Sequence, residues 1–281
     1  MKIAIASGKG GTGKTTLATN LAYFLSEKEN VTLLDCDVEE PNGHIFIKPE
    51  WVTEEKCYLP IPQVNEDKCT HCGLCSQACQ FSAIAQVKDK ILTFPELCHG
   101  CGLCALLCPS QAITEGFREI GTVQIGKKNN LNFIHGKLRV SEAMSPPLIK
   151  EVKKQGKNRG ITIIDAPPGT SCPVIQSIVN SDFVILVTEP TPFGLNDLEL
   201  AVGMVKELNI PMAVAINRAD IGDNRVQEFC AKENIPVIME IPHSYELARC
   251  YSQGNLAVQE LPEYKGYLQR IWDGVKKELA R

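Results

Sequence analysis

Short apolar runs alternate with longer amphipathic runs over most of the chain, and this alternation predicts a parallel sheet covered by helices. The predicted strands are rich in β-branched residues and bounded by turn residues. They are Lys2–Ser7, Val31–Asp35, Ile161–Asp165, Phe183–Thr188, Met212–Asn217 and Val237–Ile241. The predicted helices between them are Thr15–Glu27, Pro146–Gln155, Leu195–Leu208, Arg225–Glu233 and Glu263–Arg281. We therefore expect an α/β fold.

One interval breaks this rhythm. Roughly 120 residues separate the second predicted strand from the third, where a strand–helix–strand unit needs far fewer. Residues 41–145 are therefore expected to be an insertion. Within it, Lys48–Asp67 contains three prolines and is expected to be a semi-rigid lead-in. Gly116–Val140 is a polar return segment to which the pattern assigns no structure.

Composition excludes several classes of protein. With 281 residues, 44% hydrophobic and 22% charged, the chain is long and apolar enough to bury a core, which excludes disorder and a short disulfide-stapled peptide. The net charge of −4 disfavours binding to nucleic acid. A signal peptide is not expected before the glycine-rich loop at Gly8, and no apolar run approaches the roughly 18 residues of a membrane helix. We expect a cytoplasmic protein.

Cysteine is the unusual component, with 13 residues in the chain. Eight of them fall between Cys69 and Cys108. In a reducing compartment, such dense spacing favours metal or redox chemistry over structural disulfides.

A phosphate-binding loop follows the first predicted strand and opens the first predicted helix. Gly8-Lys-Gly-Gly-Thr-Gly-Lys14-Thr15 matches G-x-x-x-x-G-K-[ST], and this context favours the motif over a glycine-rich turn that binds nothing. Backbone N–H groups of such a loop surround phosphate oxygens, Lys14 reaches the outer phosphates and the Thr15 hydroxyl coordinates Mg²⁺. The expected nucleotide-binding residues are Gly8, Gly10, Gly11, Thr12, Gly13, Lys14, Thr15 and Thr16.

The early lysine makes the motif more specific. Lys9-Gly-Gly-Thr-Gly-Lys14-Thr-Thr16 resembles the deviant Walker A motif of the MinD/ParA class, which includes the nitrogenase iron protein and the Mrp-type iron–sulfur carriers. The resemblance implies that Lys9 crosses a dimer interface to touch the nucleotide of the other subunit, so that ATP holds the dimer together. A solvated loop lysine is the alternative.

The resemblance implies further site residues at strand ends. Asp37 corresponds to the first switch, where it would orient the water that attacks the γ-phosphate. Asp165 corresponds to the Walker B position, where it would hold Mg²⁺ through water. Asn217 and Arg218 correspond to the adenine-reading position and favour ATP; a turn asparagine is the alternative. Asp37 and Asp165 lie at the carboxyl ends of predicted strands, which is the edge where open α/β sheets bind ligands.

The clustered cysteines form a repeat. Both halves carry C-x₂-C-x₂-C-x₃-C, and the second continues into Pro109, as in bacterial ferredoxins; Gln80 stands at that position in the first half. In such runs the fourth cysteine ligates the other cluster. This predicts one [4Fe–4S] cluster on Cys69, Cys72, Cys75 and Cys108, and a second on Cys98, Cys101, Cys104 and Cys79. Zinc would more often use paired C-x₂-C units. His71 and His99 lie inside the loops and are expected near the ligands or in solvent.

Cys172 stands apart from the other cysteines. It follows Asp165 by seven residues, the offset at which the nitrogenase iron protein places a cysteine that ligates its bridging cluster. No second cysteine accompanies it in residues 116–140, so three interpretations stay open: a structural residue, a ligand of a transient cluster coupled to the second switch, or a regulatory thiol. The remaining cysteines lack ligand spacing and are expected to be small buried or incidental residues; they are Cys36, Cys57, Cys230 and Cys250.

Taken together, these features predict a parallel P-loop sheet formed by residues 1–47 and 119–281, interrupted at residues 48–118 by a small α+β ferredoxin-like insert with two clusters. The first functional hypothesis is a Mg-dependent ATPase whose ATP or ADP state gates electron transfer through the clusters to a redox partner. It would dimerise with itself or with a paralogue. A cluster scaffold or carrier is the second hypothesis. The third is a positioning ATPase whose last helix, with an apolar stripe that includes Leu268 and Ile271, binds membrane; core packing of that stripe is the favoured alternative.

Overall fold

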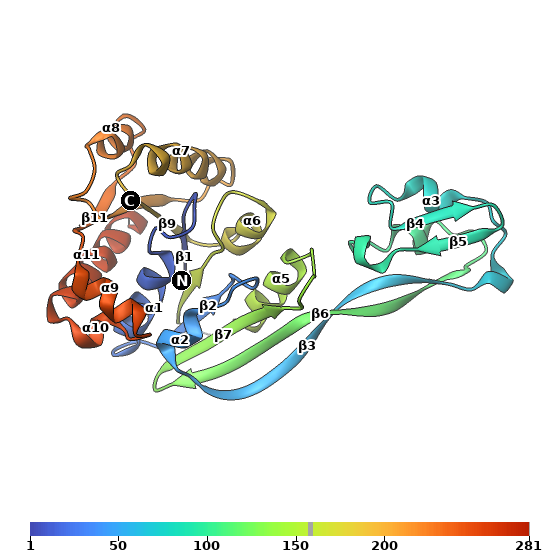
Figure 1. The fold of residues 1–281 in the computed structure, drawn as a ribbon, viewed down its shortest axis with the longest axis horizontal. Coiled ribbons are helices and arrows are strands. Elements are labelled where there is room, and N and C mark those ends of the chain that lie inside the picture. Colours follow the sequence, from blue (N-terminus) through green and yellow to red (C-terminus); the bar gives the residue numbers. More distant parts are fainter. Residues whose placement is uncertain (157–159, 281) are drawn as a thin grey trace. The chain divides into compact units, whose positions relative to one another are not determined.

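The computed structural model describes residues 1–156 and 160–280 and divides into two compact units (Figure 1). The core unit comprises Met1–Glu54, Val123–Lys137 and Ile149–Arg281, and the inserted unit comprises Glu55–Thr122 and Leu138–Leu148. The last residue of the final predicted helix, Arg281, lies outside the described residues.

All six predicted strands are present and belong to one sheet. They are β1 (Lys2–Ala6), β2 (Val31–Asp35), β8 (Ile161–Asp165), β9 (Phe183–Thr188), β10 (Met212–Asn217) and β11 (Val237–Ile241). The sheet has nine strands in the order β11-β10-β9-β1-β8-β2-β7-β6-β3. Strands β1, β2, β8, β9, β10 and β11 pair in parallel, and the register sets Asp35 of β2 beside Asp165 of β8. The carboxyl ends of these strands therefore meet at one edge of the sheet.

The central strands are apolar runs because both of their faces are covered by helices (Figure 1). Alternate residues of β1, Ile3 and Ile5, pack with α1 (Lys14–Ser26) and α11 (Pro262–Leu279). The stripe of α11 that offered a membrane-binding face is part of this core, with Leu268 and Ile271 fully buried.

Further helices complete the core unit. Helices α6 (Cys172–Ile178) and α7 (Pro192–Glu207) contact the sheet at β1, β8 and β9. The others are α2 (Gly43–Ile47), α5 (Pro146–Gln155), α8 (Arg225–Lys232), α9 (Tyr245–Ser252) and α10 (Ala257–Glu260). Predicted helix boundaries differ by up to three residues. Helix α7 begins at Pro192 rather than Leu195, because the Thr191 hydroxyl accepts a hydrogen bond from Gly194 N–H and caps the first turn.

The structure differs from expectation on both sides of the cysteine repeat. The segment expected to be a lead-in forms strand β3 (Glu50–Val64), which lies at one edge of the sheet. An edge strand has backbone N–H groups that make no hydrogen bonds within the sheet, so β3 tolerates Pro60 and Pro62. The return segment forms β6 (Ile113–Lys128) and β7 (Leu131–Leu138), and β7 pairs in parallel with β2. The interval is thus strand-rich rather than irregular.

The inserted unit is a small α+β arrangement in which the two cysteine repeats form equivalent turns. Each repeat has a short 3-10 turn, Glu66–Lys68 or Pro95–Leu97, then a glycine with positive φ, Gly73 or Gly102, and then a short helix. The helices are α3 (Leu74–Ala78) and α4 (Leu103–Leu106), and β4 (Ile84–Val87) pairs antiparallel with β5 (Lys90–Thr93). Ile84, Ile91 and Ile113 form its apolar centre.

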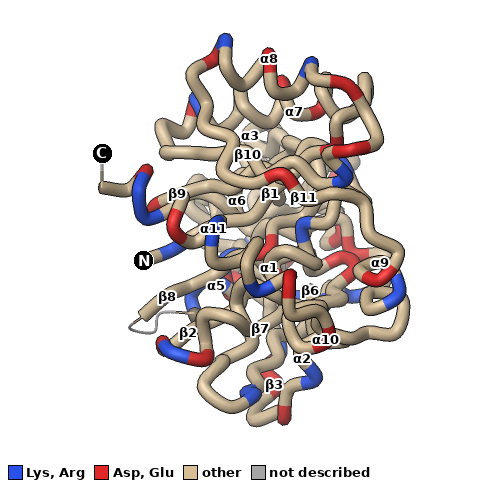
Figure 2. Tube along the Cα trace, turned by 90° about the vertical axis from the view of Figure 1, so that its left-hand side faces the viewer, with Lys and Arg blue, Asp and Glu red and all other residues tan. Residues whose placement is uncertain are grey.

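The surface carries charges of both signs. Figure 2 shows Lys and Arg interspersed with Asp and Glu along α7, α8 and α11. Among residues 1–156 and 160–280, no helix is both long and apolar enough to cross a membrane.

Candidate functional site

The phosphate-loop residues meet the predicted switch and base-reading residues around one cavity of about 500 Å³ in the core unit. The residues of the predicted set that line it are Gly10, Gly11, Gly13, Lys14, Thr15, Thr16, Asp37, Asn217 and Arg218. The loop joins β1 to α1. No side chain in the described part of the chain caps the α1 N-terminus, so its N–H groups and the helix dipole suit an anion. Gly8 and Thr12 support the loop from behind, because the Gly8 Cα packs on the Asp197 backbone and the Thr12 carbonyl accepts a hydrogen bond.

Gly13 and Asn217 are in close contact. Gly13 has φ +97°, and a Cβ there would lie 2.7 Å from Asn217 Nδ2. The same Nδ2 donates to the Thr12 carbonyl at 2.9 Å. Asn217 therefore fastens the loop to the end of β10, in addition to lining the cavity.

Three carboxylates lie at the ends of β2 and β8. Asp165 is buried, and neither of its carboxylate oxygens has a hydrogen-bond partner among the described residues. Burial raises the pKa of Asp165 to about 7 against the lowering effects of Lys14 and Thr15, and burial likewise raises that of Asp37 to about 6. Asp35 is buried too, and accepts hydrogen bonds from the Gly43 and Asp37 N–H groups. An unpaired buried carboxylate beside Lys14 and Thr15 suits a hydrated Mg²⁺.

Glu189 is a residue that the sequence analysis missed. Its carboxylate, mostly buried, lies 3.5 Å from Lys9 Nζ and accepts a hydrogen bond from Arg218 Nη1 at 2.6 Å. Glu189 directly follows the buried strand β9. Its sequence position therefore resembles that of Asp165, an acidic residue at the end of a buried strand, and could have indicated a site residue. One carboxylate thus holds two cations that the sequence assigned to nucleotide.

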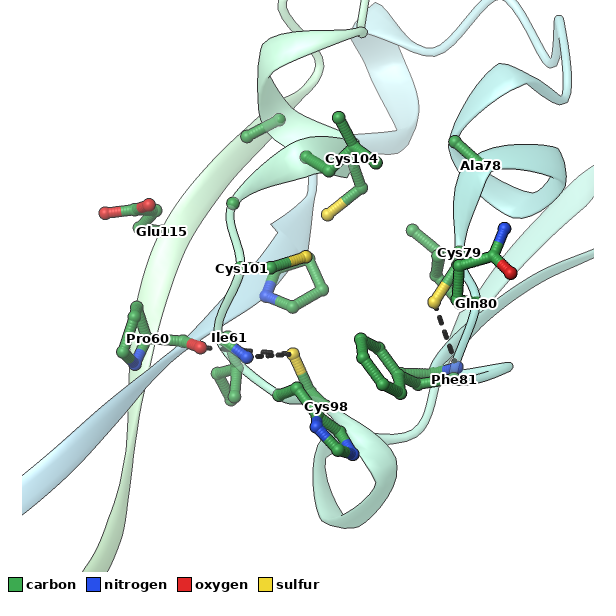
Figure 3. Close-up of a pocket in the computed structure, with 18 of the residues that line it drawn as sticks. Pro60, Ile61, Ala78, Cys79, Gln80, Phe81, Cys98, Cys101, Cys104 and Glu115 are labelled. Carbon is green, nitrogen blue, oxygen red and sulfur yellow. Dashed lines mark hydrogen bonds between the residues drawn. The ribbon is translucent and has the colours of Figure 1, made fainter. Parts of the chain in front are cut away.

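The cysteines separate into two sets of four, each around its own cavity in the inserted unit. Cys98, Cys101 and Cys104 of the second repeat and Cys79 of the first line a cavity of about 150 Å³. Figure 3 shows the four sulfur atoms directed toward a common space. Phe81 and His99 also line this cavity, with rings stacked at 3.6 Å between centroids.

The second set combines three cysteines of the first repeat with the fourth cysteine of the second repeat. Cys69, Cys72, Cys75 and Cys108 line a smaller cavity of about 20 Å³, together with apolar residues that include Ile91 and Ile113. Each fourth cysteine therefore lines the cavity of the other repeat's first three cysteines.

Backbone N–H groups point at several of these sulfur atoms. Cys79 Sγ accepts from Ala83 N–H and Cys108 Sγ from Ala112 N–H, both at 3.3 Å and both four residues along the chain. Burial raises the pKa of Cys75 and Cys104. Burial also raises that of Cys108, but hydrogen bonds from the Ser110 hydroxyl and backbone N–H groups outweigh it, so this thiol has a lowered pKa. Such hydrogen bonds stabilise thiolate ligands.

Among residues 1–156 and 160–280, no three His, Cys, Asp or Glu side chains are placed to hold a metal ion. Four thiols around an apolar cavity are the donor set of a [4Fe–4S] cluster, whose four irons each take one thiolate, so the residues present fit that group. Cys172 is exposed at the start of α6 and lines neither cysteine cavity. Cys36, Cys230 and Cys250 are buried, as expected of incidental residues.

The fold and the phosphate loop define a P-loop NTPase, and comparison with known families agrees. Residues 3–258 match the CobQ/CobB/MinD/ParA nucleotide binding domain family, and the chain belongs to that family. It is 32% identical to an uncharacterised protein of Methanocaldococcus jannaschii over 96% of both chains. It is 27% identical to an iron–sulfur cluster carrier protein of Aquifex aeolicus, covering 93% of this chain and 62% of the carrier.

Solved structures show the same fold. The septum site-determining protein MinD of Pyrococcus horikoshii, complexed with Mg-ADP, superposes with a TM-score of 0.62 at 21% identity, covering 98% of this chain and 96% of MinD. A plasmid partition protein of Borrelia burgdorferi, bound to AMPPNP, gives 0.58 at 18% identity over 98% of both chains. The chain thus has an α/β fold like that of MinD.

Proposed function

We propose that the protein is an ATPase in which nucleotide state gates electron transfer through two [4Fe–4S] clusters to a partner protein. The observation that carries the cluster assignment is the exchange of fourth cysteines. Cys79 lines the cavity of Cys98, Cys101 and Cys104, while Cys108 lines that of the first triplet. Four thiolates at each cavity would hold one cluster, which supplies one-electron chemistry when bound.

At the nucleotide site, Lys14 and the loop N–H groups would bind the phosphates of ATP. Thr15 and Asp165 would hold Mg²⁺, and the unpaired oxygens of Asp165 support that role. Asp37 lines the cavity beside the loop and would orient the attacking water. Asn217 and Arg218 line the same cavity and would contact the base. Hydrolysis needs little further chemistry from the protein, because phosphoryl transfer depends mainly on placement and charge.

The proposed coupling between the nucleotide site and the two clusters rests on how the chain connects them. The chain leaves β2 beside Asp37 and returns to β8, which ends at Asp165, so the whole inserted unit lies between the two switch residues in sequence. A movement of either switch on hydrolysis would thus act on a segment continuous with that unit. Lys9 would complete the site of a second subunit, either an identical chain or a paralogue.

The decisive experiment is anaerobic purification followed by iron analysis, EPR and ATPase assays with and without reductant. We expect about eight iron atoms per chain and two reducible clusters. We also expect cluster-dependent electron delivery to an acceptor to differ between the ATP-bound, ADP-bound and Lys14→Ala proteins. Fewer than two clusters would overturn the cluster assignment, and identical electron delivery in all three states would overturn the gating.

A cluster carrier is the second candidate function, favoured by the carrier names of distant relatives and by the exposure of Cys72 and Cys101. Quantitative movement of iron from the holoprotein to an apo-acceptor would establish this function. Clusters retained during repeated turnover of ATP would instead support electron transfer, because eight ferredoxin-type thiolates hold their clusters firmly.

A further inference from the structure

A second large cavity in the core unit lies outside the nucleotide-binding residues. It encloses about 530 Å³ beside the loop that follows β2. Its lining residues are Glu40, Pro41, Asn42, His44, Trp51, Gln124, His135 and Lys137. Glu40 lines the nucleotide cavity as well, so the two cavities are neighbours. Two of the five histidines of the chain meet here.

The proton on His135 is fixed by a chain of hydrogen bonds. Gln124 Nε2 donates to Glu54 Oε2 at 3.0 Å, which turns Gln124 Oε1 toward His135. That oxygen lies 2.6 Å from His135 Nε2 and can only accept, so Nε2 carries the proton. The other ring nitrogen, Nδ1, is left with a lone pair. It is buried and has no hydrogen-bond partner among the described residues, in a side chain that is only 3% exposed.

His44 also has a ring nitrogen that is unpartnered among the described residues. Its Nδ1 is also buried with no partner in the described part of the chain, and its ring centre lies 5.2 Å from that of His135 in an edge-to-face arrangement. Two imidazoles bound to one ion at metal–nitrogen distances of about 2.1 Å hold their ring centres roughly 5 Å apart. Burial first, and the Lys137 charge with it, lower the pKa of both histidines, that of His135 to about 4.

We propose that His44 and His135 form a binding site for a divalent transition-metal ion of the Ni²⁺, Co²⁺ or Zn²⁺ type. Imidazole is a preferred ligand of these ions, and the Glu54–Gln124–His135 chain is the kind of outer support that fixes the tautomer of ligating histidines. Asn42 lines the same cavity, and its Oδ1, buried and without a partner in the described residues, is a further donor.

The site is open rather than closed. The search for three grouped His, Cys, Asp or Glu side chains finds none among residues 1–156 and 160–280, so water or an incoming ligand takes the remaining coordination positions. Lys137 lines the same cavity and its charge opposes a cation. We therefore expect exchangeable binding, and an increase in affinity when that charge is removed.

Trp51 provides a reporter, because its ring stacks on His135 at 5.0 Å and 27°. Trp272 is the only other tryptophan in the sequence, so a Trp272→Phe background isolates the signal of Trp51. In anaerobic holoprotein carrying this change, Ni²⁺ should quench Trp51 fluorescence in a saturable manner. Equilibrium dialysis with metal analysis should then recover a nickel ion that the histidine variants fail to retain.

Variants of the cavity residues test whether the two histidines bind the nickel ion. His44→Ala and His135→Ala should each abolish the saturable quenching and remove one equivalent of bound nickel, whereas His243→Ala, which changes a histidine outside this cavity, should retain both. Gln124→Leu, which leaves both ligands in place, should weaken binding about 10- to 100-fold. Lys137→Gln should tighten it. Because these last two variants keep both histidines, they decide the matter even if the alanine variants fold poorly. Equal nickel retention by wild type, His44→Ala and His135→Ala would overturn the proposal, as would the absence of saturable binding to the wild type.

Discussion

Lys9 forms an ion pair with Glu189 of its own chain, with 3.5 Å between Nζ and Oε2. The motif containing Lys9 predicts that this lysine reaches the nucleotide of a second subunit. In the single chain it is instead neutralised by a carboxylate that Arg218 also contacts. In the proposed dimer, Lys9 would have to leave Glu189 to reach the nucleotide of the other subunit, so we expect this pair to oppose dimerisation.

Glu189→Gln should therefore promote ATP-dependent dimerisation. Lys9 is partly exposed, so the pair is worth at most about 1 kcal/mol, and the ATP concentration needed for half-maximal dimer should fall by up to about fivefold. Light scattering on size-exclusion chromatography measures this. Lys9→Ala is the control and should lose the dimer; a Glu189→Gln protein that dimerises less readily than wild type would contradict the expectation.

Gly13→Ala should destabilise the nucleotide-free protein. An alanine at φ +97° costs about 1–3 kcal/mol, and its Cβ would collide with Asn217, which fastens the loop. Gly10→Ala is the matched control, since nothing lies within 4 Å of a Cβ there and its φ is not positive. Urea unfolding should separate the two variants by more than about 1 kcal/mol; similar stabilities would show that the loop adjusts freely.

Glu142→Gln should cost more stability than any surface ion-pair change in the inserted unit. Glu142 is fully buried and pairs with the buried Arg118, so removing its charge leaves that guanidinium with only the exposed Glu96 carboxylate as an ion-pair partner among the described residues, at a cost of up to about 3–5 kcal/mol. Glu119→Gln breaks the exposed pair with Lys56 and should change the free energy of unfolding by less than about 1 kcal/mol. Thermal unfolding followed by calorimetry would rank them.

The buried His135 should make stability depend on pH. Its pKa is lowered, by burial first and then by His44 and Lys137, to about 4 from 6.5. The unfolded chain therefore binds more protons than the native protein between these values, and the free energy of unfolding falls as the pH drops from 6.5 to 4. The loss amounts to about 3 kcal/mol at most. Denaturation of wild type and His135→Gln, with chelator present, should show a stability difference that shrinks over this pH window and stays constant above it.

The exchange of fourth cysteines can be tested by pairs of substitutions. Cys79→Ala and Cys101→Ala should each leave about four iron atoms, and the double variant should retain the same number because both residues serve one cluster. Cys79→Ala with Cys72→Ala should lose both clusters. Cys57→Ala, outside both cavities, is the control. The reverse pattern of the double variants would mean that each repeat holds its own cluster.

The core unit was largely predictable because its strands are apolar runs buried on both faces. Asp37 follows β2 and Asn217 ends β10. Parallel strands place their carboxyl ends at one edge of the sheet, so sequence order alone brings these residues to one cavity. The cysteine sets were predictable for a different reason: their spacing is tight enough that chain geometry leaves few arrangements.

Features that depend on distant pairing were not predictable. β3 carries mostly exposed residues, so it has no periodic pattern, and its partner β6 lies about fifty residues later in the sequence. The histidine cavity arises because β7 pairs with β2, in a register that sets His135 beside Asp35, close to the loop that leads to His44. Nothing in the local sequence around either histidine indicates this meeting.

The placement of Cys79 and Cys108 also bears on how the protein is made. Each four-thiol set draws on both repeats, so a ribosome that has released only the first repeat has produced no complete set. Iron loaded on the nascent chain at that stage would have an open coordination position. The proposed cluster on Cys79, Cys98, Cys101 and Cys104 could be completed only after Cys104 has emerged, and the other only after Cys108 has emerged. Both would therefore be filled late and at nearly the same time, rather than one after each repeat is translated.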